Sequence, residues 1–333
     1  MTEIPQTQKA VFQPDVQSTD LTIIHDHPVP TPAPSTSEHL IRVHTAAITN
    51  GELLWMKNFP PAEDPNSSAP KKILVPCFDV AGTVVTAPPS SSFPPGTEVY
   101  ARSDYIRTGC ARAYTILLKH EMSIRPHRMS WAESATVPMS AETAWQALFV
   151  HAGLEAAPGS ARGKRIFVNA ASGGVGVWTV QLAKWAGAEV IATCGEKNFE
   201  WVRSLGADEV LDRETDFKEW AGNESRLVDV AIDCIGRKSC EDAWWVTKEG
   251  GQLVSVYQPP EAFKPGGLER NIKSMFFIMK TDGEQLQRVT DLINQGGWKT
   301  AMDSSYPVDQ FQEAFAKVAS GRTRGKVVLD LGA

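Results

Sequence analysis

The sequence predicts a two-domain α/β protein, in which a mostly β-stranded first part is followed by a doubly wound parallel sheet. The chain has 333 residues, about twice the length of a typical domain. Up to residue 130, short apolar or alternating runs are separated by turns rich in proline and serine, a pattern typical of β-structure. From residue 165, apolar strands alternate with helical stretches, which indicates βαβ units on a parallel sheet covered on both faces.

The elements of the first part are short. We expect strands at 9–12, 21–25, 40–48, 80–85, 97–101 and 113–118. Two of the connections are long, 28–37 and the proline-rich 59–71. Long connections of this kind are typical of lids and binding loops.

The second part begins with a strand at 165–169 and a helix at 174–187, whose apolar residues have helical spacing. The later elements follow the same alternation: strands at 189–194, 209–211, 227–234, 252–256 and 274–279, and a helix at 199–205. The chain closes with a helix at 308–320 and a strand at 326–329 that is able to return to the first domain.

Composition excludes several classes of partner. Basic residues number 33 and acidic residues 39, a net charge of −6, which argues against a nucleic-acid partner. No apolar run approaches the ~18–20 residues of a membrane span, and the N-terminus lacks the basic and apolar regions of a secretory signal. We therefore expect a soluble, cytoplasmic protein that does not act at a membrane.

Three kinds of catalytic site are disfavoured. The five cysteines are odd in number and have no C-x-x-C spacing, so we expect buried thiols and no disulfide framework or zinc knuckle. Ser172 lies in a turn that resembles a nucleophile elbow, but all seven histidines lie at or before His151, and such a hydrolase needs one after its serine. None of the five tyrosines has a lysine four residues later, as a short-chain dehydrogenase requires.

The strongest motif is the segment 168–176, between the first parallel strand and its helix. It fits the pattern G-x-G-x-x-G, with Ala171 in the place of the first glycine. The amides and dipole of a helix N-terminus suit a pyrophosphate. Gly173 allows the phosphate to approach the backbone, and Gly176 allows the helix to pack close to the strand. These features predict a dinucleotide site.

The end of the second parallel strand indicates which dinucleotide is bound. An NAD site needs a carboxylate at this point to bind the ribose hydroxyls, but here Thr193 occupies the position of that carboxylate. Gly195 leaves space for a 2′-phosphate, and the nearby donors are Lys197, Asn198 and, after the third strand, Arg213. Glu196 must then point away. The sequence therefore predicts NADPH.

Several further segments together resemble one family. They are VPCFDVAGTV (75–84), PGTEVY (95–100), ATVPMSAETAW (135–145), SLGAD (204–208), DVAID (229–233) and GKVVL (325–329). With the glycine loop, they resemble the zinc-independent quinone oxidoreductase branch of the medium-chain dehydrogenase/reductase superfamily, and in particular fungal trans-acting enoyl reductases of polyketide pathways.

The resemblance implies a GroES-like catalytic domain formed by residues 1–130 and 281–333, and a Rossmann NADP-binding domain over residues 131–280. It also implies a homodimer and a coenzyme in the cleft between the domains. The residues implied in coenzyme binding are Thr143, Ser172, Gly173, Gly174, Val175, Gly195, Glu196, Lys197, Asn198, Arg213, Cys234, Ile235, Tyr257 and Lys326.

The resemblance also implies that no metal takes part. Zinc-dependent relatives carry a Cys ligand in the segment that here reads AAITNGE (46–52), and Gly-His-Glu where this chain has Cys77-Phe78-Asp79. Thr49 stands where zinc-less relatives commonly have asparagine. Without a metal to polarise a carbonyl, the expected chemistry is hydride transfer from NADPH to the activated C=C bond of an enone or enoyl thioester, or to a quinone.

The proton source is open between Tyr105, in a loop that borders the cleft in relatives, and bulk water. Trp55 and Phe59 are expected to line the substrate pocket. Two alternatives to biosynthetic enoyl reduction also remain open: a quinone or enone reductase that serves detoxification, and an NADPH-binding protein without catalytic activity.

Overall fold

The computed structural model describes residues 3–34, 36–59 and 73–332. It divides the chain into two compact units. The first contains residues 1–139, 281–297 and 302–333, and the second contains residues 140–280 and 298–301. The predicted proline-rich loop 59–71 lies, apart from Phe59, outside the described residues.

The first unit is built on a seven-stranded sheet with the order β14-β15-β3-β4-β5-β7, in which β6 also pairs with β3. Its last strand in the sequence, β15, pairs antiparallel with β3 and parallel with β14, so the C-terminal strand does return to this unit. A separate antiparallel hairpin is formed by β1 and β2. The bounds are β1 (Thr7–Phe12), β2 (Thr22–Pro28), β3 (Glu38–Ile48), β4 (Asp79–Thr86), β5 (Glu98–Arg102), β6 (Tyr114–Leu118), β7 (Met122–Ile124), β14 (Met302–Pro307) and β15 (Lys326–Asp330).

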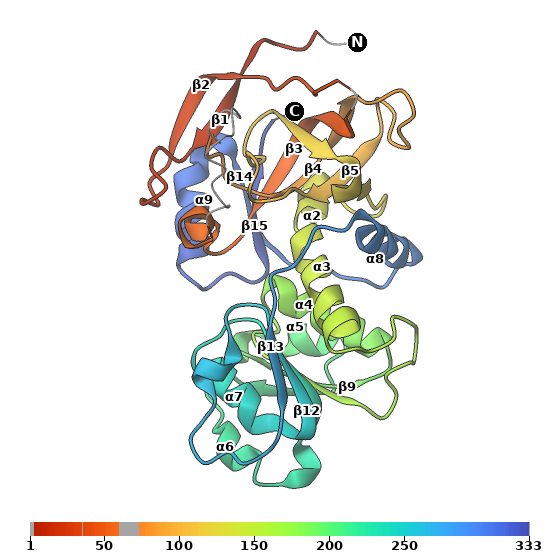
Figure 1. Cartoon of the computed structure of the whole chain (residues 1–333), viewed down its shortest axis with the longest axis vertical. Coiled ribbons are helices and arrows are strands. Elements are labelled where there is room, and N and C mark those ends of the chain that lie inside the picture. Colours follow the sequence, from red (N-terminus) through yellow and green to blue (C-terminus); the bar gives the residue numbers. More distant parts are fainter. Residues whose placement is uncertain (1–2, 35, 60–72, 333) are drawn as a thin grey trace, which may run out of the picture. The chain divides into compact units, whose positions relative to one another are not determined.

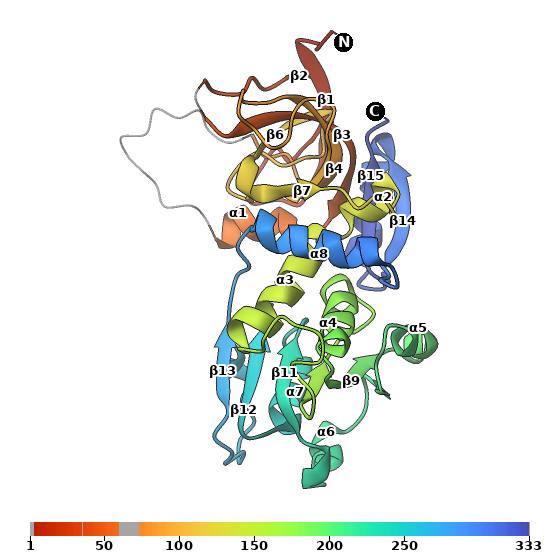
Figure 2. The same ribbon diagram turned by 90° about the vertical axis from the view of Figure 1, so that its right-hand side faces the viewer.

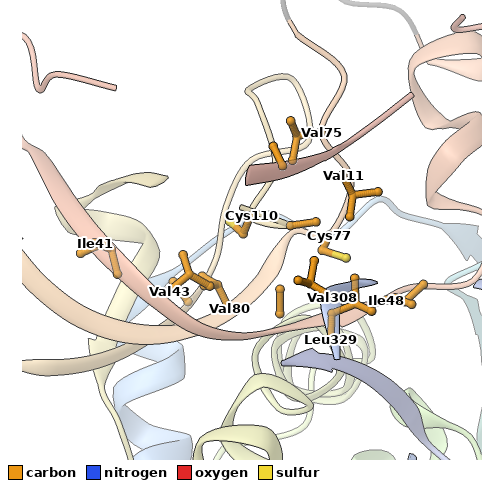
Figure 3. Packing of buried hydrophobic residues seen from close by; sticks show 14 of the residues in the cluster. Val11, Ile41, Val43, Ile48, Val75, Cys77, Val80, Cys110, Val308 and Leu329 are labelled. Atoms are coloured by element: carbon orange, nitrogen blue, oxygen red, sulfur yellow. The ribbon is translucent and has the colours of Figure 1, made fainter. Parts of the chain in front are cut away.

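One apolar cluster forms the core of this unit. The sheet and the hairpin contribute buried side chains such as Val11, Ile48 and Leu329, which Figure 3 shows close together. Helix α9 (Phe311–Ala319) lies against β14 and β15 and adds Phe311, Ala314 and Val318, a spacing that places them on one face of a helix (Figure 1). The burial pattern therefore follows the alternation of the strands and the period of the helix.

The first unit extends past residue 130 because helix α2 (Trp131–Ala135) packs on strands β3 and β4. The ring of His44 stacks on Trp131 with 4.0 Å between centroids, and the Thr45 hydroxyl donates to the Trp131 carbonyl at 2.8 Å. A capping box begins the helix: Ser130 accepts from the Glu133 amide, and the Glu133 carboxylate accepts from the Ser130 amide.

Several elements of this unit were not among the predicted ones: the short strand β7, the short helices α1 (Trp55–Asn58) and α2, strand β14 and helix α8 (Gly283–Gln295). Helix α8 is capped by Asp282 and lies beside β7 (Figure 2). The Thr290 hydroxyl on this helix lies 2.8 Å from the Tyr100 hydroxyl of β5. Helix α1 follows the 3-10 turn at Glu52–Leu54.

The second unit is a six-stranded parallel sheet with the order β10-β9-β8-β11-β12-β13. Its first strand, β8, lies between β9 and β11, so the strand order reverses beside it, as in doubly wound folds that bind dinucleotides. The bounds are β8 (Arg165–Val168), α4 (Gly174–Trp185), β9 (Glu189–Cys194), α5 (Phe199–Ser204), β10 (Glu209–Asp212), α6 (Phe217–Trp220), β11 (Val228–Asp233), α7 (Lys238–Val246), β12 (Thr247–Ser255) and β13 (Lys273–Phe276). Helix α3 (Pro138–Trp145) and a π-helical turn at Gln146–His151 lead into this unit.

Helices α6 and α7 share a buried apolar cluster with strands of this sheet, and its largest buried side chains are Trp220, Trp244, Phe167 and Phe217. All five cysteines are free thiols, four of them buried and Cys234 half-buried. Within the part of the chain that the structure describes, no helix is both long and apolar enough to span a membrane.

Candidate functional site

The glycine loop lies at the carboxyl end of β8, beside the reversal of strand order. Ala170 adopts a positive φ of 47°, and the Ala171 amide donates to the Thr193 carbonyl of β9 at 2.9 Å. Gly173 is the N-cap of α4, so the predicted residues Ser172, Gly173, Gly174 and Val175 form the entry to the first turn of this helix. The Gly173 amide donates to the Ala170 carbonyl at 2.9 Å. The first amides of a helix have no acceptor within the helix, so this position suits an anionic group.

Gly176 brings the helix close to the strand. A β-carbon at this position would lie 2.4 Å from the Ala170 carbonyl oxygen and 2.6 Å from the Ala171 Cα. Both distances are too short for any side chain without movement of the backbone. The glycine is therefore required by packing, which agrees with the role assigned to it in the motif.

The second loop follows β9 and is joined to the first. Asn198 Nδ2 donates to Ser172 Oγ at 3.3 Å, which brings together two of the predicted segments. A β-carbon at Gly195 would have no atom within 4 Å, so the space beside it is open. Glu196 and Lys197 are exposed in a 3-10 turn.

Arg213 joins the same edge of the sheet through its backbone, because its amide donates to the Cys194 carbonyl at 3.1 Å. Its guanidinium forms an exposed ion pair with the adjacent Glu214 at 3.2 Å. The cations Lys197 and Arg213 thus stand near the end of β9 together with the carboxylates Glu196 and Glu214.

A buried polar network, which was not predicted from the sequence, holds the carboxyl ends of three strands. Asn169 after β8 donates to Asp233 Oδ1 of β11 at 2.6 Å and accepts from the Cys234 amide at 2.6 Å. Asp233 also accepts from the Gly236 amide at 2.9 Å and from the Ser255 hydroxyl of β12 at 2.7 Å. The signal available in the sequence was the polar residue that ends each apolar strand.

This network fixes the loop that contains the predicted residues Cys234 and Ile235. Ile235 is 48% exposed and Tyr257, after β12, is 47% exposed, so both present apolar surface at this edge. Gly236 has a φ of 76°, and a β-carbon there would lie 2.6 Å from the Tyr257 ring. Thr143 is buried in α3.

The first unit contains a second cluster, formed by charged groups that are almost completely buried. Lys326, at the start of β15, forms an ion pair with Asp79 Oδ2 at 2.7 Å and donates to Thr49 Oγ1 at 2.5 Å. Glu52 accepts from the Thr49 amide at 3.1 Å and from the Cys77 amide at 3.0 Å. Of these residues only Lys326 was predicted as a site residue, and the structure places its ammonium against Asp79 and Thr49.

Burial raises the pKa of the Glu52 carboxyl to about 7, and Asp79 acts in the same direction, whereas the Lys326 ammonium and the amides of Thr49 and Cys77 oppose the change. The folded chain therefore holds this proton more tightly than the unfolded chain, in which the carboxyl has its ordinary pKa of 4.5.

We expect this difference to make folding stability depend on pH. Since the folded-state pKa of Glu52 is raised, its contribution to stability is fully present below pH 4.5 and is lost as pH rises to 7. The loss amounts to about 3 kcal/mol. Urea unfolding at pH 5 and pH 8 measures it. Glu52→Gln is expected to remove most of the dependence, whereas Glu313→Gln, at an exposed site on α9, serves as the control. An unchanged dependence in Glu52→Gln would assign the effect to another group.

The predicted residues Trp55, Phe59 and Tyr105 lie together in the first unit. The Trp55 ring stacks on Phe78 with 5.6 Å between centroids and meets Tyr105 edge-on at 6.0 Å. The Tyr105 hydroxyl donates to the Phe59 carbonyl at 3.3 Å. Their predicted roles, donor for Tyr105 and pocket wall for Trp55 and Phe59, stay predictions.

A cavity of about 690 Å³ lies in the same unit and is lined in part by residues of the 48–54 segment. Its lining is largely apolar and includes Leu21, Leu53, Phe315 and Val318, together with Thr49 and Glu52. Neither Trp55 nor Phe59 is among its lining residues.

The described residues contain no cluster of three or more His, Cys, Asp or Glu side chains suited to a metal ion. The acidic side chains of the buried cluster already have partners, since the Lys326 ammonium binds Asp79 and backbone amides bind Glu52. A zinc ion needs three or four N, S or O ligands in tetrahedral geometry, and a lysine ammonium is itself a cation. These side chains do not fit a zinc ion.

Comparisons with known proteins agree with this architecture. The model of the alcohol dehydrogenase GroES-like domain matches residues 35–142, and that of the zinc-binding dehydrogenase matches residues 205–329. The chain is 48% identical over 335 residues to a probable zinc-binding oxidoreductase, mitochondrial, of Arthroderma benhamiae, covering 99% of this chain and 98% of that protein. It is 32% identical to the chloroplastic quinone-oxidoreductase QR1 of Triphysaria versicolor, covering 91% and 92%.

Solved structures share the fold at lower sequence identity. An NAD-dependent alcohol dehydrogenase superposes with a TM-score of 0.80 at 23% identity, covering 98% of this chain and all of that one. The CurK enoyl reductase superposes with a TM-score of 0.79 at 22% identity, covering 97% and 99%.

Proposed function

The chain belongs to the medium-chain dehydrogenase/reductase family of NAD(P)H-dependent oxidoreductases, and we propose that it uses NADPH to reduce activated carbon–carbon double bonds without a metal ion. The acceptors would be enones or enoyl thioesters, in which a carbonyl group makes the double bond electron-poor. The enoyl reductase neighbour in the fold comparison is in keeping with this choice.

The observation that carries the proposal is the position of the Lys326 ammonium. It lies between Asp79 and Thr49, in the two segments where zinc-dependent relatives are expected to carry metal ligands. A metal ion is the usual means of polarising a simple carbonyl for hydride exchange. The Lys326 ammonium and the Thr49 hydroxyl are hydrogen-bond donors, which suit an oxygen that gains negative charge during conjugate reduction. The Arthroderma relative is named a zinc-binding oxidoreductase, which would favour a bound metal ion. Elemental analysis of the purified protein distinguishes a zinc-containing enzyme from a metal-free one.

The loops at the carboxyl ends of the parallel strands fit a dinucleotide. The amides of Ser172 to Val175 would hold its diphosphate, because they begin a helix beside the reversal of strand order. The open space beside Gly195, with Lys197, Asn198 and Arg213 nearby, would hold a 2′-phosphate. The residues proposed for the nicotinamide half are Thr143, Cys234, Ile235, Tyr257 and Lys326.

Bound NADPH would supply a hydride for the β-carbon of the acceptor. The chain's own contribution is rigidity and exclusion of water. The network from Asn169 to Asp233 and Ser255 holds the Cys234–Gly236 loop, so the apolar surfaces of Ile235 and Tyr257 are fixed at the edge of the sheet.

A quinone is the second candidate acceptor, favoured by the 32% identity to the quinone-oxidoreductase of Triphysaria. A role in fungal secondary metabolism, assembly into a homodimer and a cytoplasmic location stay predictions. The sheet has two edge strands, β10 and β13, either of which could join two sheets across a two-fold axis. Size-exclusion chromatography with light scattering would test whether a dimer forms.

The proposal is tested by coenzyme binding followed by turnover. Calorimetry should find tighter binding of NADPH than of NADH, and NADPH oxidation should be faster with enones or enoyl thioesters than with quinones. Elemental analysis should find no stoichiometric zinc. Faster turnover of quinones alone would favour the second candidate acceptor. A lack of affinity for both NADPH and NADH would refute both proposed activities.

The choice of coenzyme gives a sharper prediction. In the double variant Lys197→Ala/Arg213→Ala, the Kd for NADPH should rise by roughly 10-fold or more, since two cations beside the 2′-phosphate are lost. The Kd for NADH should stay nearly unchanged. Lys248→Ala is the matched control. This lysine pairs with Asp229 near the amino ends of β12 and β11, whereas the loops proposed to bind the coenzyme follow the carboxyl ends of the strands. An equal loss of affinity for NADH and NADPH would show that these side chains do not select the phosphate.

A further inference from the structure

The hydroxyl of Thr49 has two different partners. Its oxygen accepts a hydrogen bond from the Lys326 ammonium at 2.5 Å, and its own proton is directed to Met139 Sδ at 3.4 Å. A thioether sulfur is a weak acceptor. A hydroxyl that accepts from a cation becomes a stronger donor, because hydrogen bonds in a chain polarise one another. Thr49 is therefore a polarised donor whose proton has only a weak partner within the chain.

The groups around Thr49 hold it in place. The Thr49 amide donates to Glu52 at 3.1 Å, so the backbone of the residue is fixed by the same carboxylate that accepts from Cys77. The Lys326 side chain is 8% exposed and is paired with Asp79, which is completely buried. Because its partners are set before any ligand arrives, the donor needs little rearrangement to bind an oxygen atom.

Thr49 also lies on the wall of the 690 Å³ cavity, whereas Lys326 and Asp79 do not. The volume is within the range of sites for small organic molecules. The cavity has an apolar part, which includes Leu21, Leu53 and Phe315, and a polar part, so it suits a molecule with an apolar body and a polar end that carries a hydrogen-bond acceptor. The polar lining residues are Thr19, Asp20, Thr49, Asn50, Glu52 and Gln312.

We propose that Thr49 is the catalytic residue that donates a hydrogen bond to the carbonyl oxygen of the acceptor substrate bound in this cavity, and that Lys326 is the positioning residue that polarises it. This inference rests on the proposed function, since the oxygen gains negative charge only when a conjugated double bond is reduced. It places the donor at Thr49 and not at Tyr105, whose hydroxyl donates to the Phe59 carbonyl.

The first test uses an oxyanion probe and no turnover. The full-length protein is titrated with 4-nitrophenol in the absence of coenzyme, and absorbance reports the phenol and phenolate forms. We expect the wild type to favour bound phenolate over phenol by roughly tenfold relative to free solution, since a donor next to an ammonium stabilises an oxyanion. Thr49→Ser should keep this preference, and Thr49→Val should lose it.

Two controls separate this role from a structural one. Thr97→Val removes a hydroxyl from an exposed turn of the same unit, where it donates to the Pro94 carbonyl, and should change nothing. Ala316→Trp fills the cavity and should abolish binding of the probe. If the phenolate preference survives in Thr49→Val, or if the probe binds equally well to Ala316→Trp, the assignment is wrong.

The second test follows turnover. Thr49→Val should lower kcat for an enone by about 100-fold, as expected when one donor to an oxyanion is removed, with the Kd for NADPH unchanged. If the wild type does not bind NADPH, the proposed function is wrong. Normal NADPH affinity and enone turnover, with no effect of Thr49→Val on kcat or on the phenolate preference, would overturn this inference alone.

Discussion

Replacing Gly176 with alanine is expected to destabilise the second unit and to abolish tight coenzyme binding. The new methyl group would lie 2.4 Å from the Ala170 carbonyl oxygen, so helix α4 must move away from the end of β8. Overpacking against backbone costs about 3 kcal/mol. The same movement displaces the helix N-terminus, and the Kd for NADPH should rise by roughly 100-fold. Thermal unfolding and calorimetry measure the two effects.

Gly266→Ala is the matched control for Gly176→Ala. Gly266 lies in the same unit, has an ordinary backbone conformation, and has no atom within 4 Å of the position of an added β-carbon. Both the unfolding temperature and the affinity for NADPH should stay close to those of the wild type. If Gly176→Ala behaves in the same way as Gly266→Ala, close packing of α4 on the loop is not a requirement of the site.

Lys326→Met is expected to cost about 3–5 kcal/mol of folding stability, because it leaves the Asp79 carboxylate buried without its ion-pair partner. The additional change Asp79→Asn should recover part of the loss: it removes the charge and keeps an oxygen for the Met139 amide, which donates to Asp79 Oδ1 at 2.7 Å. Urea unfolding of the single and double variants measures both values.

An exposed ion pair provides the comparison for Lys326→Met. Lys9 and Asp309 are 2.8 Å apart, but their side chains are 37% and 65% exposed, so Lys9→Met should cost about 0–1 kcal/mol. Equal losses in the two lysine variants, or no recovery in the double variant, would show that burial of the Asp79 charge is not the source of the effect.

The sequence predicted the parallel sheet of the second unit well because its signals are local. The glycine loop, the strand before it and the helix after it lie within about twenty residues, and each has a pattern that sequence alone displays. Strand boundaries differ by a few residues, as at β13, which ends at Phe276. The fold class and the family resemblance are confirmed.

The buried clusters were not predicted because their members are distant in sequence. Lys326 and Thr49 are 277 residues apart, and Asn169 and Asp233 are 64 residues apart. No periodicity connects such pairs, so only the folded chain shows that they are partners.

The two longest of the missed elements of the first unit, strand β14 and helix α8, were missed for different reasons. Strand β14 is polar, lies at the edge of its sheet and ends in Pro307, so it lacks the apolar alternation of a strand. Helix α8 did carry a readable signal, with Asp282 as N-cap and Leu286, Val289 and Ile293 on one face.

The position of β15 has a consequence for synthesis on the ribosome. This strand, residues 326–330, lies between β14 and β3, so the sheet of the first unit has a gap until residue 330 has been translated. The parallel sheet, which ends with β13 at residue 276, has all its strands much earlier. During translation the edge of β3 that later pairs with β15 therefore stays unpaired and is able to pair with other chains. A molecular chaperone that covers this edge would protect the nascent chain from aggregation during this period.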